Sequence, residues 1–387
     1  MRVLALSHVF PRSPADAAAP FLLGWAQALT GAGARVVVVA PHDAGLPLRH
    51  RVGEVAVRRA RYGPDAAERL AYRGEMHELV RSGAGPLLLA SLLEALARAL
   101  RAQVRAGRPD IVHVHWWLPG AVVARLARPG VPVVVTLHGT DVALLESRPA
   151  FAGLARWALG GADRIEAVSA DLAERLERTC GVRADAVAPM PLHPSLLAGP
   201  PAHPPATTAH DATGVRTLQV LASGRLVPEK GFGDLIEAVG LLKRPARLTI
   251  LGEGGQRDAL AARALTLDVD LDLPGRVAPA EVAAAYRRAG VLAHPSHREG
   301  LGMVVAEALA AGVPVVATDS GGVRDLLPAA DLVPVRDPAA LAAALEEVGA
   351  DRSSAQRKAG ARAQAIRTRL SPTAVAARAL DGYRSMM

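Results

Sequence analysis

The amino-acid sequence predicts an α/β protein built from two doubly wound, Rossmann-like domains that face a central cleft. Short, unbroken apolar runs alternate along the chain with longer amphipathic segments. This alternation is typical of parallel sheets covered by helices on both faces. A stretch rich in proline, threonine and alanine divides the runs into two sets, and a chain of 387 residues suits two domains better than a single core.

We expect the first domain over residues 1–190, a linker over 191–214 and the second domain over 215–370. The linker lacks apolar periodicity, which distinguishes it from the segments on either side. An amphipathic helix is predicted at the end of the chain, about 371–387. The apolar runs that predict strands are VLALS, VVVVA, IVHVH, VPVVVTLH and RIEAVS, followed after the linker by TLQVLASG, RLTILG, VLAHPS and VPVVAT.

Cysteine usage and the chain start bear on the compartment. The only cysteine, Cys180, excludes an intramolecular disulfide and is interpreted as a small apolar filler in a reducing compartment. The opening MRVLALSHVF predicts a first strand rather than a signal peptide, because no small-residue cleavage pattern follows it. No run reaches about 18 consecutive apolar residues, the length that would suggest a membrane-spanning helix. We therefore expect a cytoplasmic protein, with the inner face of the membrane as an alternative location.

The formal net charge of +8 makes anionic partners worth weighing. Aromatic residues make up only 3% of the chain, and no basic-aromatic pattern typical of RNA binding is present, so no nucleic-acid partner is predicted. The strongest basic cluster lies in RHRVGEVAVRRARY. It is either a solvated face or a patch that attracts an anionic membrane surface or acceptor. Its members are Arg49, Arg51, Arg58, Arg59 and Arg61.

Cationic residues follow two of the predicted strands in the second domain. Arg225 and Lys230 stand in GRLVPEKG after TLQVLASG, and HREGLG leads from VLAHPS into a helix predicted from Met303 to Ala311. Ligands of doubly wound folds bind at the carboxyl ends of the strands. Two cations and the free amides of a helix start can hold a diphosphate without a metal ion. For either cation alone, a surface salt bridge is the alternative.

Two glutamates flank the Gly-Leu-Gly turn of this segment. Glu299 precedes the turn, and Glu307 lies about one helical turn beyond it. The spacing is common by chance, so only the setting is informative. Carboxylates accept hydrogen bonds from vicinal hydroxyls. One acid can therefore face a sugar while the other reaches a ribose.

Four motifs together resemble a known family. GRLVPEKG, LGEGG, HREGLGMVVAEALAAGVPVVATDSGG and HGTD are similar to motifs of the family-4 retaining glycosyltransferases, which have the two-domain GT-B architecture. The resemblance implies that Arg225 and Lys230 hold the donor diphosphate. It assigns the ribose to Glu307 and the transferred sugar to Glu299, with no metal and no cofactor. Further donor contacts are implied for Gly224, Leu301, Gly302, Met303 and, at the base, Gly275 to Val277.

In the first domain the resemblance is looser. HVFPRSPADAAAPFLLGWAQAL is similar to the family's acceptor-side loop and first helix, but AAAPF (17–21) stands where many members have a Gly-Gly pair near the donor phosphate. APMPLHP (188–194) likewise replaces a usual Pro-Asn-Gly-Val. HVHWWLPG and HGTD are similar to a branch that assembles cell-surface polysaccharides. Contacts on the acceptor side are implied for Phe21, Trp117 and Asp141, and His138 is implied to approach the sugar.

The activity implied is transfer of a hexosyl group from UDP-hexose, or alternatively GDP-mannose, to a hydroxyl on a polymer, a lipid-linked intermediate or a small molecule. A double displacement needs two carboxylates about 5 Å apart, and only Glu299 is brought to the sugar. Front-face attack is therefore expected, with the leaving phosphate as the base. Catalytic roles fall to His138, Arg225, Lys230 and Glu299. The C-terminal helix is implied to pack on the first domain.

Bland interpretations stand beside several of these roles. His113 and His115 share a strand face but have no third ligand, so local hydrogen bonds are expected rather than a metal pair. Asp141 can cap the helix after HGTD instead of binding acceptor. Glu253 in LGEGG is interpreted as a turn residue. Of the neighbouring tryptophans 116 and 117, we expect one in the core and one at the cleft.

Rival classes share parts of this pattern. A phosphorylase would need a cofactor-binding lysine, yet the first domain contains no lysine. A nicotinamide dehydrogenase needs a glycine fingerprint after its first strand, where SHVFPRSP stands instead. A sugar-nucleotide epimerase and a non-catalytic binding partner remain as alternatives. A degenerate partner protein would be expected to lack the acids or the cations, and all four are present.

Overall fold

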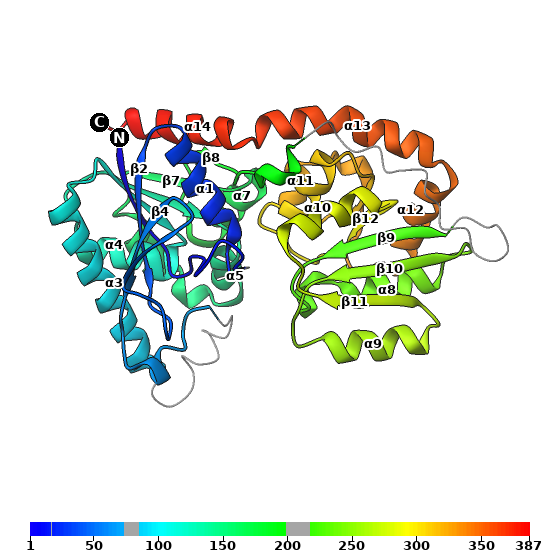
Figure 1. Ribbon diagram of the computed structural model, residues 1–387, viewed down its shortest axis with the longest axis horizontal. Helices are drawn as coiled ribbons and strands as arrows, with labels where there is room; N and C mark the ends of the chain where they lie inside the picture. Colours follow the sequence, from blue (N-terminus) through cyan, green and yellow to red (C-terminus); the bar gives the residue numbers. More distant parts are fainter. Residues whose placement is uncertain (17, 73–84, 199–216) are drawn as a thin grey trace. The chain divides into compact units, whose positions relative to one another are not determined.

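The computed structural model describes residues 1–16, 18–72, 85–198 and 217–387. The chain divides into two compact units, the first formed by residues 1–191 with 372–387 and the second by residues 192–371 (Figure 1). Each unit contains a mainly parallel sheet with helices packed against it. Most of the expected linker, and Ala17 of the first loop, lie outside the described residues.

The first unit is built on an eight-stranded sheet within the described residues, in the order β3-β4-β2-β1-β5-β6-β7-β8. All neighbours are parallel except β3 and β4, which form an antiparallel hairpin at one edge. The apolar runs of the sequence become its buried central strands. The bounds are β1 (Arg2–Leu6), β2 (Arg35–Pro41), β3 (Arg49–Val52), β4 (Val55–Ala60), β5 (Ile111–His115), β6 (Val133–Leu137), β7 (Arg164–Ala167) and β8 (Ala186–Val187).

The helices of the first unit cover this sheet, and α1 and α14 pack against each other (Figure 1). Their described bounds are α1 (Pro20–Gly31), α3 (Gly85–Gly107), α4 (Val122–Ala127), α5 (Thr140–Ser147), α6 (Ala152–Leu159), α7 (Ala170–Cys180) and α14 (Pro372–Arg384). Helix α7 shows how local sequence fixes such an element. Ser169 accepts a hydrogen bond from the amide of Leu172 at its start, and Gly181 ends it in the left-handed conformation.

Four of the five arginines of the cluster lie on the hairpin of β3 and β4, and the prediction of a solvated face is wrong for Arg59. Arg59 is buried, with only 5% of its surface exposed. Its guanidinium donates to the carbonyls of Phe10 (3.1 Å) and Pro11 (2.6 Å) and to the hydroxyl of Tyr72 (2.6 Å). Buried charge must be hydrogen-bonded to be tolerated, and the loop after β1 supplies the acceptors. Arg59 therefore holds that loop in place instead of facing solvent.

The second unit contains a six-stranded, fully parallel sheet in the order β11-β10-β9-β12-β13-β14, as far as its residues are described. The chain starts in the middle and winds outward in both directions, so β9 and β12 are neighbours at the reversal of strand order. The strands are β9 (Leu218–Ser223), β10 (Ala246–Leu251), β11 (Asp270–Gly275), β12 (Val291–His294), β13 (Val315–Thr318) and β14 (Leu332–Val333).

The helices of the second unit connect these strands, and two apolar clusters fill the space between the helices and the sheet. Their bounds are α8 (Phe232–Gly240), α9 (Arg257–Thr266), α10 (Pro279–Arg288), α11 (Met303–Ala310), α12 (Pro338–Ala350) and α13 (Arg352–Arg369). In the described part of both units, no helix is long and apolar enough to cross a membrane.

Helix α14 follows the second unit in sequence but belongs to the first. Tyr383 of α14 is 1% exposed, and its hydroxyl lies 2.6 Å from Nδ1 of His113 on β5. Nε2 of the same ring lies 2.8 Å from Oγ1 of Thr136, whose hydroxyl donates to Glu166. Since that hydroxyl proton is used, Thr136 accepts from His113 Nε2, and His113 Nδ1 accepts from Tyr383. Local hydrogen bonds thus occupy both nitrogens of His113, as expected.

Replacing Tyr383 with phenylalanine should destabilise the first unit. The change leaves Nδ1 of His113 buried without its donor, a loss of about 1–3 kcal/mol in the free energy of unfolding. Urea unfolding followed by tryptophan fluorescence measures it selectively, because residues 25, 116, 117 and 157, the four tryptophans, all lie in this unit. The control is Arg384→Ala on the same helix, an exposed residue whose pair with Asp381 is also exposed.

An unfolding midpoint for Tyr383→Phe equal to that of the wild type would show that the hydroxyl does not anchor α14.

Candidate functional site

Two loops at the carboxyl edge of the second sheet bring together three of the predicted site residues. One joins β9 to α8 and contains Arg225 and Lys230, and the other joins β12 to α11 and contains Glu299. Because β9 and β12 are parallel neighbours, their carboxyl ends lie side by side. The site therefore forms where the strand order reverses, which is the usual ligand position of such sheets.

A close backbone contact fixes these loops against each other. Gly231 begins α8 with φ +65°, and a Cβ there would lie 2.1 Å from the carbonyl oxygen of Pro295. The amide of His297 donates to the carbonyl of Glu229 (2.9 Å), and Nε2 of His297 lies 2.7 Å from Oδ2 of Asp234. Only glycine fits both the left-handed conformation and the contact. The contact between Gly231 and Pro295 therefore fixes the position of Lys230 in the loop.

The contact places Lys230 beside Glu299. Nζ of Lys230 forms an ion pair with Oε1 of Glu299. The same oxygen accepts a hydrogen bond from Ser296 Oγ (2.8 Å) and lies 3.1 Å from Nε2 of His294. The side chain of Glu299 is 11% exposed and that of Lys230 is 21% exposed. A carboxylate with three partners on one oxygen keeps a single orientation.

Burial alone would raise the pKa of Glu299. The charge and hydrogen bond of Lys230, together with the adjacent His294 ring, outweigh it and hold that pKa well below its ordinary value. Glu299 is therefore an ionised acceptor at neutral pH and does not supply a proton. Sequence reasoning missed His294 and Ser296 as its partners. Their signal was present in VLAHPS, where polar residues end an apolar strand.

Arg225 differs from Lys230 although both lie in one loop. It is exposed, and its guanidinium has no hydrogen-bond or ion-pair partner among the described residues. A fixed loop with a partner-free cation is suited to an anion. Gly224 precedes it with φ +156°, and its Cα faces the ring of Phe232. This part of the loop is anchored while the cation remains available.

The start of α11 adds backbone donors at the same edge. The amides of residues 301–304 have no acceptor within the described part of the chain. Gly302 precedes the helix with φ +81°, and Gly322 packs so closely that a Cβ would lie 2.0 Å from the carbonyl of Gly300. Unpaired amides and the positive end of the helix dipole favour a negative group.

Glu307 lies one turn into α11. It accepts a hydrogen bond from the hydroxyl of Tyr286 (2.9 Å), a residue of α10 that is fully buried. Burial raises the pKa of Glu307 to about 7, and the bond from Tyr286 opposes that rise. The two glutamates therefore have opposite electrostatic settings, one ionised beside a cation and one near the midpoint of its titration at neutral pH.

The predicted base-contact segment lies after β11. Gly252 donates through its amide to the carbonyl of Gly275 (2.9 Å), which joins the β10 and β11 loops. Val277 is half-buried against the apolar cluster around Tyr286. Glu253 is exposed and pairs with Arg276 (3.4 Å), which agrees with its interpretation as a turn residue.

His138 directly follows β6 in the first unit and is half-buried. The ring of Trp116 lies 4.4 Å from it and that of Phe21 lies 5.2 Å from it, measured between centroids. Nε2 of His138 lies 3.1 Å from Nδ1 of His115. Phe21, the first of the predicted acceptor-side residues, thus packs on the implied sugar contact.

The prediction for Trp117 is wrong. Trp117 is fully buried, and its indole N–H donates to the carbonyl of Asp141 (2.9 Å). Trp116 is only 7% exposed, so the expected division between core and cleft is also wrong. The polar atom of Trp117 finds a partner inside the unit, which explains how a residue beside a strand end becomes core.

Asp141 is 4% exposed and ties the turn before α5. Its Oδ1 accepts from the amides of Gly139 (2.9 Å) and Val142 (3.0 Å). The cap position itself is Gly139, so Asp141 performs a capping function from inside the helix rather than from the predicted cap position. Burial raises the pKa of its carboxyl. Because the carboxyl of Asp141 is buried, an acceptor substrate cannot reach it from solvent.

The loop between β1 and α1 has an unusual backbone conformation at a residue that is not glycine. Ala19 precedes α1 with φ 52° and ψ 54°, a left-handed conformation that favours glycine. This residue lies in the stretch AAAPF, where the resemblance expected a Gly-Gly pair. Alanine therefore adopts here a conformation that usually requires glycine, at a conformational cost of about 1 kcal/mol.

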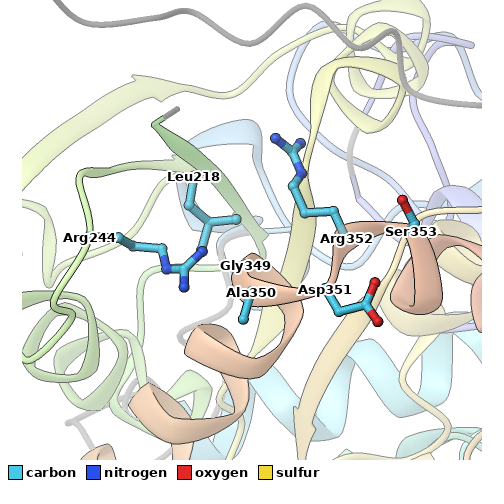
Figure 2. Close-up of a pocket in the computed structure, with 7 residues that line it drawn as sticks. All are labelled: Leu218, Arg244, Gly349, Ala350, Asp351, Arg352 and Ser353. Carbon is cyan, nitrogen blue, oxygen red and sulfur yellow. The ribbon is translucent and has the colours of Figure 1, made fainter. Parts of the chain in front are cut away.

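A cavity of about 280 Å³ lies at the opposite, amino-terminal edge of the second sheet (Figure 2). It is bordered by the start of β9 at Leu218 and the junction of α12 and α13. Arg244 within it pairs with Glu346 (2.7 Å), and Asp351 caps α13. These polar groups already have partners within the fold. The cavity is separate from the site described above, because it lies at the other edge of the sheet.

A group of potential metal ligands, His42, Asp65 and Glu68, lies in the described part of the first unit. Nδ1 of His42 pairs with Glu68, and its Nε2 lies 2.7 Å from the carbonyl of Leu46. Asp65 is exposed and pairs with Arg61. Both imidazole nitrogens are used, so the arrangement is one of structural hydrogen bonds.

Known families match both units. The model described as Glycosyltransferase Family 4 matches residues 19–191, and that described as Glycosyl transferases group 1 matches residues 212–365. The D-inositol 3-phosphate glycosyltransferase of Frankia alni is 33% identical over 323 residues, covering 75% of this chain and 77% of that protein. The chain belongs to the family-4 glycosyltransferases.

The alignments with two other relatives cover smaller shares of both chains. The D-inositol 3-phosphate glycosyltransferase of Pseudarthrobacter chlorophenolicus is 35% identical over 257 residues, 61% of this chain and 60% of that protein. The putative teichuronic acid biosynthesis glycosyltransferase TuaC of Bacillus subtilis is 33% identical over 226 residues, 56% of this chain and 55% of that protein. The chain thus spans less than two thirds of the length of these two relatives.

Solved structures resemble both units. Sucrose-phosphate synthase from Thermosynechococcus elongatus has a TM-score of 0.80 at 20% identity, covering 99% of this chain and 98% of that chain. Anabaena HepE in complex with UDP-glucose has a TM-score of 0.72 at 19% identity and full coverage of both chains. At such identities the likeness establishes the fold alone. The predicted class, two Rossmann-like domains of GT-B type, is confirmed.

The stability of the second unit should depend on pH through Glu307. Its folded pKa, about 7, exceeds the ordinary value of 4.5, so folding favours the neutral acid. That contribution is fully present below about pH 4.5 and is lost as the pH rises through about 7. Calorimetric unfolding between about pH 5 and pH 8 should show Glu307→Gln gaining about 1–3 kcal/mol on the wild type as the pH rises.

The matched control is Glu253→Gln, an exposed acid of the same unit. A difference between Glu307→Gln and the wild type that stays constant across this range would contradict the raised pKa.

Proposed function

We propose that the protein transfers a hexosyl group from a nucleoside diphosphate sugar to a hydroxyl acceptor, with retention at the anomeric carbon and without a metal ion. One observation carries the proposal: the partner-free Arg225, the part-buried Lys230–Glu299 pair and the free amides at the start of α11 gather at one sheet edge. Such a group of donors suits a diphosphate, and the carboxylate beside it suits sugar hydroxyls.

Each residue has a distinct task in this proposal. Arg225, Lys230 and the amides of residues 301–303 bind the diphosphate, and Glu299 accepts hydrogen bonds from the transferred sugar. Glu307 accepts from the ribose, and His138 contacts the sugar. The ion pair of Lys230 with Glu299 supports the first two assignments, because it holds the phosphate-binding cation beside the sugar-binding acid.

The proposed chemistry needs no protein base. The acceptor oxygen forms a bond to the anomeric carbon as the bond from that carbon to the diphosphate oxygen breaks, and the acceptor proton passes to the leaving phosphate. The low pKa of Glu299 supports this route, since a carboxylate whose pKa is held low is a weak base and does not retain the acceptor's proton. The cations and helix amides stabilise the charge that grows on the diphosphate.

The donor we favour is UDP-hexose, with GDP-mannose second. The complex of Anabaena HepE with UDP-glucose supports the first choice by fold likeness. A polymeric or lipid-linked acceptor is favoured by the relative TuaC, which is named for teichuronic acid biosynthesis, and a small acceptor by the relatives named for D-inositol 3-phosphate. Arg49 and Arg51, exposed on the edge strand β3, support peripheral contact with an anionic membrane.

A panel of nucleoside diphosphate sugars with and without acceptor tests this function against its rivals. Nucleotide release that requires acceptor supports transfer. Conversion of the sugar nucleotide without acceptor supports an epimerase, and binding without turnover supports a non-catalytic partner protein.

Removing either cation should abolish most of the transfer. We expect Arg225→Ala and Lys230→Ala each to lower the rate about 100- to 1,000-fold, because a lost donor to the developing phosphate charge costs that much. The rate of nucleotide release measures it. Lys243→Ala, which removes an exposed cation from the opposite edge of the same unit, is the control.

Thermal unfolding of Arg225→Ala and Lys243→Ala should stay near that of the wild type. Lys230→Ala should unfold at a lower temperature, because it leaves Glu299 without its ion pair, but it should still unfold cooperatively. Turnover close to normal in either Arg225→Ala or Lys230→Ala would contradict the assigned roles.

A further inference from the structure

A second histidine, His115, contacts His138, the residue proposed to contact the sugar. His115 ends β5, is 1% exposed, and places Nδ1 3.1 Å from Nε2 of His138. The ring of His113 stacks on it at 4.7 Å, and the edge of Trp25 meets it at 4.6 Å, at 88°. These contacts hold the His115 ring on two sides, so it cannot turn away from His138.

Only one of the two rings can donate the hydrogen bond that joins them. Burial lowers the pKa of both His115 and His138 well below the ordinary value, so each ring is neutral and carries a single N–H. A hydrogen bond between Nδ1 of His115 and Nε2 of His138 requires one of these nitrogens to donate and the other to accept. The direction of this bond decides which nitrogen of His138 bears its proton.

The other nitrogen of His115 decides the direction. Nε2 of His115 is buried and has no hydrogen-bond partner among the described residues. If it bore the proton, a buried N–H would be orphaned, which is rare in proteins and costs more than an unused lone pair. The proton therefore belongs on Nδ1 of His115, which donates to His138. His138 then accepts through Nε2 and bears its own proton on Nδ1.

We propose that His115 is a positioning residue that holds His138 as the neutral tautomer protonated on Nδ1. His138 thereby acts as a hydrogen-bond donor toward a sugar or acceptor oxygen and not as a general base. Its rotation is restricted by Trp116 and Phe21, whose rings pack around it. This inference rests on the proposed function for its consequence in catalysis, but the tautomer itself is a property of the substrate-free protein.

Nitrogen-15 NMR of the full chain labelled in histidine tests the tautomer without any substrate. The signal of His138 is assigned by its loss in His138→Gln. We expect the wild-type protein to show His138 protonated on Nδ1 with an unprotonated Nε2. A His138 protonated on Nε2, or on both nitrogens at neutral pH, would overturn the proposal. This measurement does not require any variant of His115 to fold.

Two variants of His115 separate positioning from packing. His115→Asn retains an N–H donor near the position of Nδ1, whereas His115→Leu fills similar space without a donor. We expect His115→Leu to shift His138 toward the Nε2-protonated form and to lower kcat about 10- to 100-fold, as expected for loss of a group that orients a functional histidine. The KM for donor should change little, and His115→Asn should recover most of the kcat.

Equal losses in the leucine and asparagine variants, with the His138 tautomer unchanged in both, would show that His115 only packs. If no nucleoside diphosphate sugar supports transfer while His138 is protonated on Nδ1, the proposed function fails and the positioning of His138 stands.

Discussion

The candidate site depends on the close approach of Gly231 to the carbonyl of Pro295. No side chain fits between these two backbones, and the left-handed conformation of Gly231 independently requires glycine. The contact joins the loops after β9 and β12, so that Lys230 from one meets Glu299 from the other. Every later property of the site, from the low pKa of Glu299 to the gathering of donors, follows from the fixed separation of these loops.

Lys230 and Glu299 balance each other's charge at this edge of the sheet. Lys230 neutralises a nearly buried carboxylate, and Ser296 and His294 support that carboxylate on the same oxygen. Breaking such a pair is costly when one charge stays buried. A diphosphate that draws on Lys230 must therefore compensate Glu299, and the hydroxyls of an attached sugar can do so. We infer that an intact sugar nucleotide fits this charge balance better than a free diphosphate.

The sequence was sufficient for the strands formed by the apolar runs and for the placement of Arg225, Lys230 and Glu299 at one edge, because apolar periodicity and motif order are local signals. It did not predict the hairpin of β3 and β4 or the two-residue strands β8 and β14. It was not sufficient for contacts between distant segments. The burial of Arg59 and Trp117 depends on carbonyls of Phe10, Pro11 and Asp141, which no periodicity reveals. The pairing of His115 with His138 is also such a contact, since alternation on a strand gives the face of a residue but not its partner.

Calorimetric titration of UDP and GDP into the wild type and Glu299→Gln tests the central claim most directly. If Lys230 serves a diphosphate in competition with Glu299, the glutamine variant should bind whichever nucleotide the wild type binds about tenfold more tightly, a gain of about 1.4 kcal/mol. It should also lose transfer from the intact donor. Asp270→Asn, which removes an exposed acid at the amino end of β11 in the same unit, should bind as the wild type does. Equal or weaker nucleotide binding in Glu299→Gln would contradict the account.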